Sequence, residues 1–195
     1  IFLTGRAGTG KTTFLQNFIQ KTAKKFAVVA PTGIASINAG GVTIHSMLGL
    51  PLTTFVPTAE FIDRNEAINI PHLLPHFKYR RDKLKLLRTL DILIIDEVSM
   101  LRCDVLDMMD LALRTARKST HRFGGLQILF IGHLHQLPPV VKSESEAILY
   151  RYYNSPFFFE AKALEGLSLL TVSLKKIYRQ TDPVFLQVLN GIPDN

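Results

Sequence analysis

Short apolar runs alternate with longer stretches of mixed character along the chain. Five of these runs are predicted to be strands, at residues 1–4, 26–30, 91–95, 126–131 and 167–172. Five other segments are predicted to be helices, at residues 11–25, 33–39, 79–90, 101–118 and 182–189. Because apolar runs that alternate with helices are typical of a parallel sheet covered on both faces, the sequence predicts an α/β fold.

Residues 50–78 interrupt this alternation. Four prolines fall within the segment and no hydrophobic period is sustained through it. We therefore expect a long excursion over the surface that holds a small hairpin or helix. The abrupt start of the chain on an apolar run also predicts that it is cut from a longer protein.

Composition and charge narrow the class of protein. The chain is 47% hydrophobic and contains no apolar run of about 18 residues, which argues against wholesale disorder and against a membrane span. Its single cysteine cannot form an internal disulfide, so a soluble protein of a reducing, intracellular compartment is expected. There are 23 Lys and Arg against 16 Asp and Glu, a net charge of +7. This excess favours a polyanionic partner such as nucleic acid, although many basic proteins bind none.

The segment GRAGTGKT at residues 5–12 fits the pattern G-x-x-x-x-G-K-[ST]. Its glycines allow positive φ angles and a close approach to an oxyanion, which the turned N–H groups and the following helix then bind. Lys11 is expected to reach the β- and γ-phosphates. The alternative is a plain glycine turn, but the match lies where phosphate binding needs it, between an apolar run and an amphipathic helix. The predicted nucleotide-binding residues are Gly5, Ala7, Gly8, Thr9, Gly10, Lys11, Thr12 and Thr13.

The predicted strand at 91–95 is followed directly by Asp96 and Glu97. A carboxylate at the tip of a strand beside the phosphate loop can hold Mg²⁺, and its neighbour can orient or deprotonate an attacking water. Acidic residues at a helix start, which the helix dipole favours, are the alternative explanation. Together with the phosphate loop, Asp96 and Glu97 predict a nucleoside triphosphatase. Its catalytic residues include Lys11, Asp96 and Glu97, and its metal ligands are Thr12 and Asp96.

Further segments match one family in the same order: APTGIAS at 30–36, TIHS at 43–46, IIDEVSM at 94–100, GHLHQLPPV at 132–140 and IYRQ at 177–180. With them, the chain resembles the first motor domain of a superfamily 1B DNA helicase of the petite-integration-frequency type, related to the RecD proteins. The resemblance implies a RecA-like P-loop NTPase domain at residues 1–174 with a surface insertion at about 50–78. It also implies that residues 175–195 are the truncated start of a second motor domain.

The resemblance implies further site residues. Gln136 matches the glutamine that senses the γ-phosphate, and Arg179 matches an arginine that reaches this phosphate when two motor domains close. Taken alone, His45 fits a structural histidine, Gln136 a loop cap and Arg179 a surface residue, so only the surrounding motifs favour the functional roles. The residues implied to contact single-stranded DNA are Pro31, Thr32, Gly33, Thr43, His45 and Pro138.

Two features of the insertion region have open interpretations. The stretch KYRRDKLKLLR at 78–88 has six Lys and Arg against one Asp, which fits a solvated helix face and contact with a DNA backbone equally well. Phe55 and Phe61 lie where the family inserts a wedge or pin that splits duplexes. Their rings would either stack on unpaired bases or pack the loop.

Two positions depart from the family pattern. His133 stands where the family carries an acid near the magnesium, and imidazole cannot supply that charge. We therefore expect weakened hydrolysis or coupling, with nucleotide binding largely kept. Pro193 stands where related chains continue a helix, and proline disfavours helix at Ile192. His133 and His135 make a poor metal pair, because no clear third ligand is present.

Together these inferences predict an ATP- and Mg²⁺-dependent motor fragment that couples hydrolysis to 5′-to-3′ translocation on single-stranded DNA and meets duplex junctions. Direction, and duties in DNA repair, recombination or telomere maintenance, come from the resemblance alone. Without a second motor domain, the fragment should bind nucleotide, hydrolyse it poorly and unwind nothing. The alternatives are a non-hydrolysing, nucleotide- and DNA-binding remnant of an inactivated or mobile-element helicase, and an unrelated P-loop ATPase such as a chaperone-like remodeller. The expected location is a bacterial cytoplasm, or a nucleus or mitochondrion, with no membrane partner.

Overall fold

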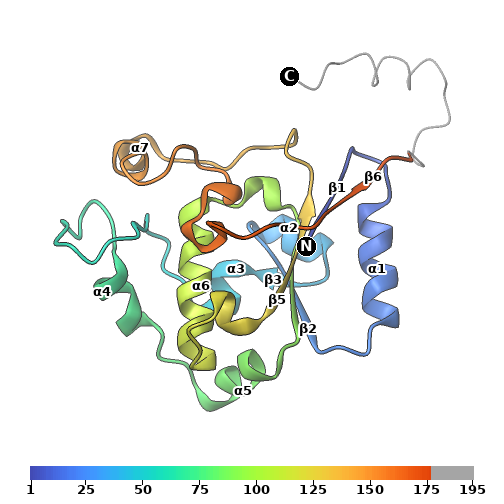
Figure 1. Ribbon diagram of the computed structural model, residues 1–195, viewed down its shortest axis with the longest axis horizontal. Helices are drawn as coiled ribbons and strands as arrows, with labels where there is room; N and C mark the ends of the chain where they lie inside the picture. The colour runs from blue at the N-terminus through green and yellow to red at the C-terminus, as the bar shows by residue number, and fades with distance from the viewer. Residues whose placement is uncertain (177–195) are drawn as a thin grey trace.

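The computed structural model describes residues 1–176, which form one parallel sheet with helices on both faces (Figure 1). The strands of this region are β1 (Phe2–Gly5), β2 (Phe26–Ala30), β3 (Val42–Thr43), β4 (Ile92–Ile95), β5 (Gln127–Gly132) and β6 (Thr171–Leu174). Their order across the sheet is β3-β2-β4-β5-β1-β6, and every neighbouring pair is parallel. The structure therefore confirms the predicted α/β fold.

Seven α-helices connect or follow these strands within residues 1–176: α1 (Lys11–Lys21), α2 (Gly33–Asn38), α3 (Ile44–Leu48), α4 (Ile70–Leu73), α5 (Arg81–Thr89), α6 (Cys103–Arg117) and α7 (Ser143–Leu149). Short 3₁₀ helices are η1 (Leu74–His76), η2 (Val98–Met100), η3 (Arg122–Gly125), η4 (Phe158–Glu160) and η5 (Lys162–Leu164). Among the described residues, none of the helices combines the length and the apolar character that a membrane crossing requires.

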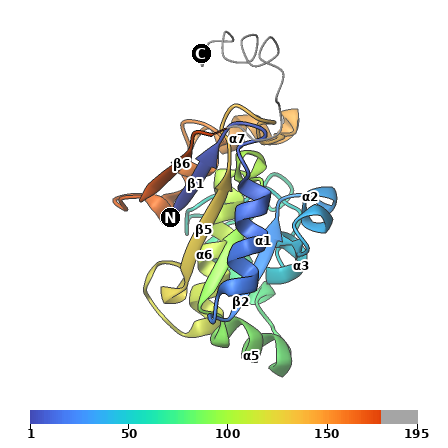
Figure 2. The same ribbon diagram turned by 90° about the vertical axis from the view of Figure 1, so that its right-hand side faces the viewer.

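The strand side chains supply two apolar layers, one on each face of the sheet. In β4 all four residues are buried, and they alternate between the faces, as strand geometry requires. Ile92 and Ile94 pack in the cluster that contains Leu15 of α1. Leu93 and Ile95 pack in the larger cluster that contains the buried face of α6. Figures 1 and 2 show α1 and α6 on opposite faces of the sheet.

Some element boundaries differ from those predicted. The last strand begins at Thr171 rather than at residue 167, because its register with β1 pairs residues 171–174 with residues 2–5. The first helix ends at Lys21, since Thr22 takes an extended conformation. The sequence did not predict β3, α3 or α7, which are two, five and seven residues long. The helix predicted at 182–189 lies outside the described residues.

The excursion at 50–78 is closed on itself by a backbone bridge and packs on the domain through buried apolar side chains. The backbones of Phe55 and Ile68 form an isolated parallel bridge, and α4 and η1 follow. Phe55 is only 1% exposed and belongs to the main apolar cluster, so of the two alternatives left open for its ring, packing holds and base stacking does not. Burying its ring against the sheet layer leaves it unavailable to a ligand. Phe61, in contrast, is 95% exposed.

Helix α6 is the centre of the larger layer, and it carries three buried aspartates at three-residue spacing. Asp104 accepts a hydrogen bond from the Phe55 N–H at 3.1 Å and pairs with Arg102. Asp107 accepts from the Tyr153 hydroxyl at 2.7 Å and from the backbone N–H groups of residues 162 and 163. Asp110 accepts from the backbone N–H of residue 123. Each carboxylate therefore fastens a different loop to one helix, which explains why charged groups are tolerated there.

Candidate nucleotide and nucleic-acid site

The phosphate loop lies between the end of β1 and the start of α1. Gly8 and Gly10 have φ angles of 80° and 89°, a left-handed conformation that side-chain-bearing residues rarely adopt. At Gly5 the restriction is steric, since a Cβ atom would lie 2.8 Å from the Leu174 carbonyl oxygen of β6. The loop therefore has the shape that the GRAGTGKT motif predicts.

Lys11 lies over this loop. Its Nζ donates to the backbone carbonyl of Gly5 and, at 3.2 Å, to that of Arg6. The Thr9 hydroxyl donates to the same Arg6 carbonyl at 2.8 Å. Burial lowers the pKa of the Lys11 ammonium, whereas the nearby carboxylates Glu97 and Asp96 raise it. A half-buried cation between backbone carbonyls and two carboxylates is well placed to meet a polyphosphate.

Asp96 and Glu97 leave β4 at the edge of the sheet that carries the phosphate loop. The Asp96 carboxylate accepts the Glu97 N–H at 3.0 Å, which orients it. Glu97 has a φ of 50° and a ψ of 45°, a left-handed conformation that is uncommon outside glycine and that clusters at functional sites. Burial raises the pKa of both carboxyl groups; Asp96 raises that of Glu97 further, and Lys11 lowers both.

Two cavities meet around these residues. The smaller, of about 410 Å³, is lined by loop residues from Ala7 to Thr13 together with Glu97 and Gln136. The larger, of about 1010 Å³, shares Thr12, Glu97 and Gln136 with it. Gln136 therefore stands between the cavities, and its Oε1 is buried without a hydrogen-bond partner among the described residues. The other residues that line the larger cavity include Thr32, Ile34, Asp96, Met100 and Pro138.

Thr32 and Thr43 occupy equivalent places on neighbouring strands. Thr32 follows β2 and Thr43 ends β3, at the same edge of the sheet. Each threonine caps the next helix. The Thr32 Oγ1 accepts the Ala35 N–H at 3.3 Å, and the Thr43 Oγ1 accepts the Ser46 N–H at 3.2 Å. The capping role is therefore real, yet each hydroxyl keeps its own proton to donate. Pro31 and Gly33 adjoin Thr32 on the same connection.

His45 lies apart from the other residues predicted to contact DNA. It lines a polar cavity of about 620 Å³ that also contains Arg102, Lys142 and Ser145. Burial lowers the pKa of the His45 imidazole, Asp104 raises it and Arg102 lowers it. The two cations of this cavity were not predicted as site residues, because they come from segments far apart in the sequence and belong to no motif.

The remaining predicted positions have less defined surroundings. The rings of His133 and His135 lie 5.1 Å apart, centre to centre. Within residues 1–176 no group of three or more His, Cys, Asp or Glu side chains is arranged to hold a metal ion. Arg179 and Pro193 lie outside the described residues.

The raised pKa of Glu97 makes a prediction about pH. If Glu97 is the general base, it must be ionised, so the rate of hydrolysis falls as the pH drops through its pKa. Because burial raises that pKa, the fall is expected at a higher pH than an exposed glutamate would give. The measurement is kcat against pH. An acid limb within the ordinary glutamate range would contradict the assignment.

Comparison with known proteins gives a consistent result. The profile of the PIF1-like helicase family matches residues 1–184. The ATP-dependent DNA helicase PIF1 of Saccharomyces cerevisiae is 36% identical over 198 residues, which cover 97% of this chain and 20% of that protein. Human PIF1 is 30% identical over 193 residues, covering 98% of this chain and 27% of that protein.

Solved structures agree with the sequence relatives. The crystal structure of Bacteroides Pif1 bound to ssDNA matches with a TM-score of 0.85 and 44% identity, covering 97% of this chain and 41% of that one. The chain thus spans between a fifth and about two fifths of the length of these relatives. The family profile matches more than nine tenths of the chain, and with the shaped phosphate loop and its two neighbouring carboxylates it shows that this chain belongs to the PIF1-like helicase family.

Proposed function

We propose that this chain is the ATP-hydrolysing part of a DNA helicase that moves 5′ to 3′ along single-stranded DNA. The observation that carries the proposal is the larger cavity, which joins Thr12, Asp96 and Glu97 on the nucleotide side to Thr32 and Pro138 on the other. A continuous cavity of this kind lets a change at a γ-phosphate reach the groups that grip a strand. Bacteroides Pif1 has been solved in complex with ADP-AlF3 and ssDNA, which supports the same pairing of ligands.

The nucleotide roles follow from the side chains that line the two cavities. The loop N–H groups and Lys11 would bind the β- and γ-phosphates of ATP. The Thr12 hydroxyl and the Asp96 carboxylate are the oxygen donors that Mg²⁺ prefers, and the bound ion supplies positive charge against the phosphate oxygens. Glu97 would take a proton from the attacking water, and the unpartnered Gln136 Oε1 would accept a hydrogen bond from that water or its neighbours.

The DNA roles belong to the connections that follow β2, β3 and β5. Hydroxyl and backbone N–H groups of Thr32, Gly33 and Thr43 would hold strand phosphates, with Pro31 and Pro138 beside them. His45, close to Arg102, would contact the strand farther along. The fork-splitting role of the insertion at 50–78 remains part of the proposal, with the exposed Phe61 as its stacking candidate.

The proposed division of the chain places a motor domain at residues 1–174 and the start of a second at 175–195. In this arrangement Arg179 would complete the nucleotide site only when the two domains close, so hydrolysis by this chain alone is expected to be weak. Duties in DNA repair, recombination or telomere maintenance, and a location in a bacterial cytoplasm, nucleus or mitochondrion, are proposed on the family relationship alone.

His133 provides the test of this function. We expect His133→Asp to raise DNA-stimulated ATP hydrolysis by about tenfold, because an acid beside the metal site replaces a neutral or cationic ring. The measurement is steady-state ATPase, with and without single-stranded DNA, on a polypeptide that carries this chain together with a second motor domain. His76→Asp, which makes the same change at an exposed histidine outside both cavities, is the matched control, and its rate should stay near that of the wild type.

The result also separates the two functions considered for the chain. DNA-stimulated turnover in the wild type that increases in His133→Asp supports a helicase motor whose activity is lowered by His133. Nucleotide binding with no turnover in either protein would overturn the motor proposal and leave a nucleotide- and DNA-binding remnant. Turnover that does not respond to DNA would instead favour an unrelated P-loop ATPase.

A further inference from the structure

Cationic side chains are concentrated at the amino edge of the sheet, the edge at which the parallel strands begin. Three connections meet there because each precedes a strand: residues 21–25 lead into β2, residues 81–91 into β4 and residues 114–126 into β5. These connections contain eleven of the 23 Lys and Arg of the chain but only two of its 16 Asp and Glu. The rest of the chain carries a small excess of acids, so the net charge of the protein resides on this edge.

Part of this charge has a structural role. Arg117 donates to the carbonyls of Leu87, Leu90 and Gly124, and Arg88 donates to that of Ala116 at 2.7 Å. These arginines tie the connection at 81–91 to the connection at 114–126. Lys83 of α5 donates to the Ser46 carbonyl at 3.3 Å. The basic stretch at 78–88 is therefore only in part a solvated face.

A second group of cations is available to a partner. These side chains are exposed, and no side-chain hydrogen bond or ion pair joins them to other described residues: Lys21, Lys25, Arg81, Lys85 and Lys118. They come from all three connections, so they form one basic surface rather than one charged helix. We call these five residues the amino-edge cations.

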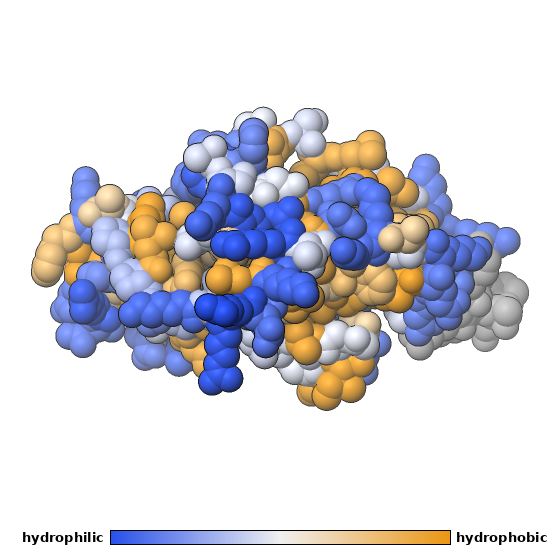
Figure 3. Space-filling model, turned by 90° about the horizontal axis from the view of Figure 1, so that it is seen from below, coloured by the Kyte–Doolittle hydropathy of each residue, from blue (hydrophilic) through white to orange (hydrophobic). Residues whose placement is uncertain are grey.

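The basic surface is remote from the nucleotide site. Figure 1 shows α5 and the ends of α1 and α6 at the bottom of the molecule, whereas the phosphate loop lies at the top. Figure 3 views the molecule from below, and strongly hydrophilic side chains project from the centre of that view. A strand held near Thr32 and Thr43 would therefore leave the amino edge free for a second ligand.

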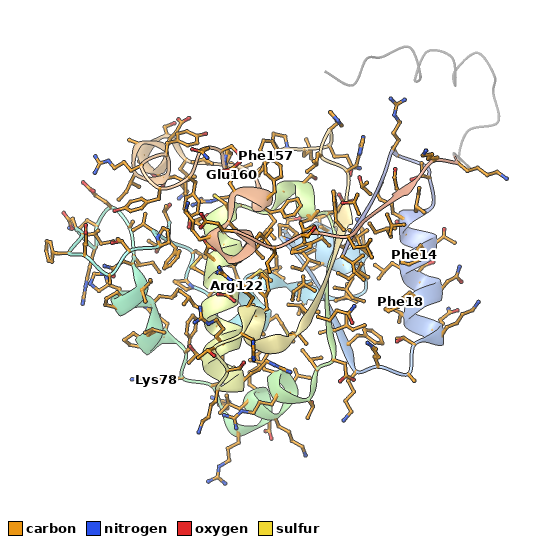
Figure 4. The ribbon with its side chains drawn as sticks, in the orientation of Figure 1. Phe14, Phe18, Lys78, Arg122, Phe157 and Glu160 are labelled. Carbon is orange, nitrogen blue, oxygen red and sulfur yellow. The ribbon has the colours of Figure 1, made fainter. Side chains whose placement is uncertain are left out.

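The chemistry of this edge favours double-stranded over single-stranded DNA. Single strands are usually held by cations together with exposed aromatic rings on which bases stack. Among the described residues in and beside the three connections, Phe123 is buried and Phe26 is half-buried, and the Tyr79 hydroxyl beside α5 is committed to the Leu48 carbonyl at 2.6 Å. Phe14 and Phe18 of α1, labelled in Figure 4, stack on each other with ring centres 6.2 Å apart, so one face of each ring is already covered. Cations without rings recognise regularly spaced phosphates and no base sequence.

We propose that the amino-edge cations bind the phosphate backbone of double-stranded DNA, as a second nucleic-acid surface opposite the nucleotide site. The surface holds a duplex without reading its sequence and depends strongly on salt. Its action needs neither ATP hydrolysis nor the contacts proposed at Thr32, Thr43 and His45.

The test is a charge reversal, Arg81→Glu with Lys118→Glu, measured by fluorescence anisotropy. The probes are a labelled blunt duplex of about 20 base pairs, two helical turns, and a single strand of equal length. Titrations at several salt concentrations are expected to show duplex binding weakened by at least about tenfold, and a log–log salt slope shallower by about 2. Binding of the single strand should change by less than about twofold.

The matched control is Arg151→Glu with Lys175→Glu, which makes the same change of charge at exposed residues without side-chain partners, outside the three connections. It should bind the duplex much more tightly than the amino-edge variant does. Fluorescent ATP-analogue binding reports whether each variant folds. Equal loss in both variants, or equal loss of duplex and single strand in the amino-edge variant, would overturn the proposal. Unchanged duplex binding would also overturn the proposal, and an acidic protein would then be the candidate partner for this surface.

Discussion

Replacing Glu97 by glutamine is expected to lower DNA-stimulated ATP hydrolysis by about 10²- to 10⁴-fold, because an amide cannot take a proton from the attacking water. Nucleotide binding should stay close to that of the wild type. Glutamine has the same length as glutamate, and removing one of two adjacent carboxylates relieves their mutual repulsion beside Lys11. The measurements are steady-state kcat and equilibrium binding of a fluorescent ATP analogue, on a polypeptide that includes a second motor domain.

Two comparisons make the Glu97 result specific. Glu165→Gln changes an exposed glutamate outside both nucleotide-side cavities and should leave kcat unchanged. Asp96→Asn should weaken the dependence on Mg²⁺ as well as kcat, since Asp96 is proposed as a metal ligand. If Glu97→Gln loses nucleotide binding as strongly as it loses turnover, Glu97 serves the ground-state complex and is not the general base.

Replacing Asp107 by alanine is expected to lower the free energy of unfolding by about 3–5 kcal/mol. The substitution leaves three donors without their acceptor in a buried place: the Tyr153 hydroxyl and the backbone N–H groups of Lys162 and Ala163. A buried donor without an acceptor costs about 1–3 kcal/mol, and the three costs are only partly additive. Urea denaturation followed by circular dichroism measures the change.

Two controls accompany Asp107→Ala: one changes an exposed aspartate, and the other removes one hydrogen-bond donor to Asp107. Asp82 is an exposed residue of α5 whose carboxylate accepts no hydrogen bond from the described residues. Asp82→Ala therefore removes the same chemical group and should change the free energy of unfolding by less than about 0.5 kcal/mol. Tyr153→Phe removes one of the three donors and should cost less than Asp107→Ala. A loss below about 1 kcal/mol for Asp107→Ala would mean that water or a shifted loop satisfies the donors.

The parts of the fold that the sequence predicts are those with a local signal. β4 reads as a strand because four consecutive apolar residues face both layers, and α6 reads as a helix because its apolar positions recur at helical spacing. β3 has no such signal, because two residues are too few for a period. The start of β6 is fixed by its register with β1, a pairing across most of the chain that local pattern cannot reveal.

The candidate site divides in the same way. The phosphate loop and Asp96–Glu97 are contiguous in the sequence, so motif and chemistry identify them together. Arg102 and Lys142 reach the His45 cavity only through folding, from connections that carry no motif. Phe55 and Phe61 look alike in the sequence, yet Phe55 packs in the main apolar cluster and Phe61 lies in solvent, a difference that only the tertiary contacts decide.

The position of β1 in the sheet also sets the order in which the protein can fold during synthesis. Of the six described strands β1 is made first, but its neighbours β5 and β6 are made from residues 127–132 and 171–174. Strands β2 and β4 can pair much earlier, whereas β1 waits for partners distant in the sequence, which slows folding. Gly5 packs against Leu174, so the phosphate loop is completed only when β6 has been made. A nascent chain therefore acquires its nucleotide-binding shape only after residues 171–174 are made, and until residues 127–132 follow it keeps an apolar strand unpaired and within reach of chaperones.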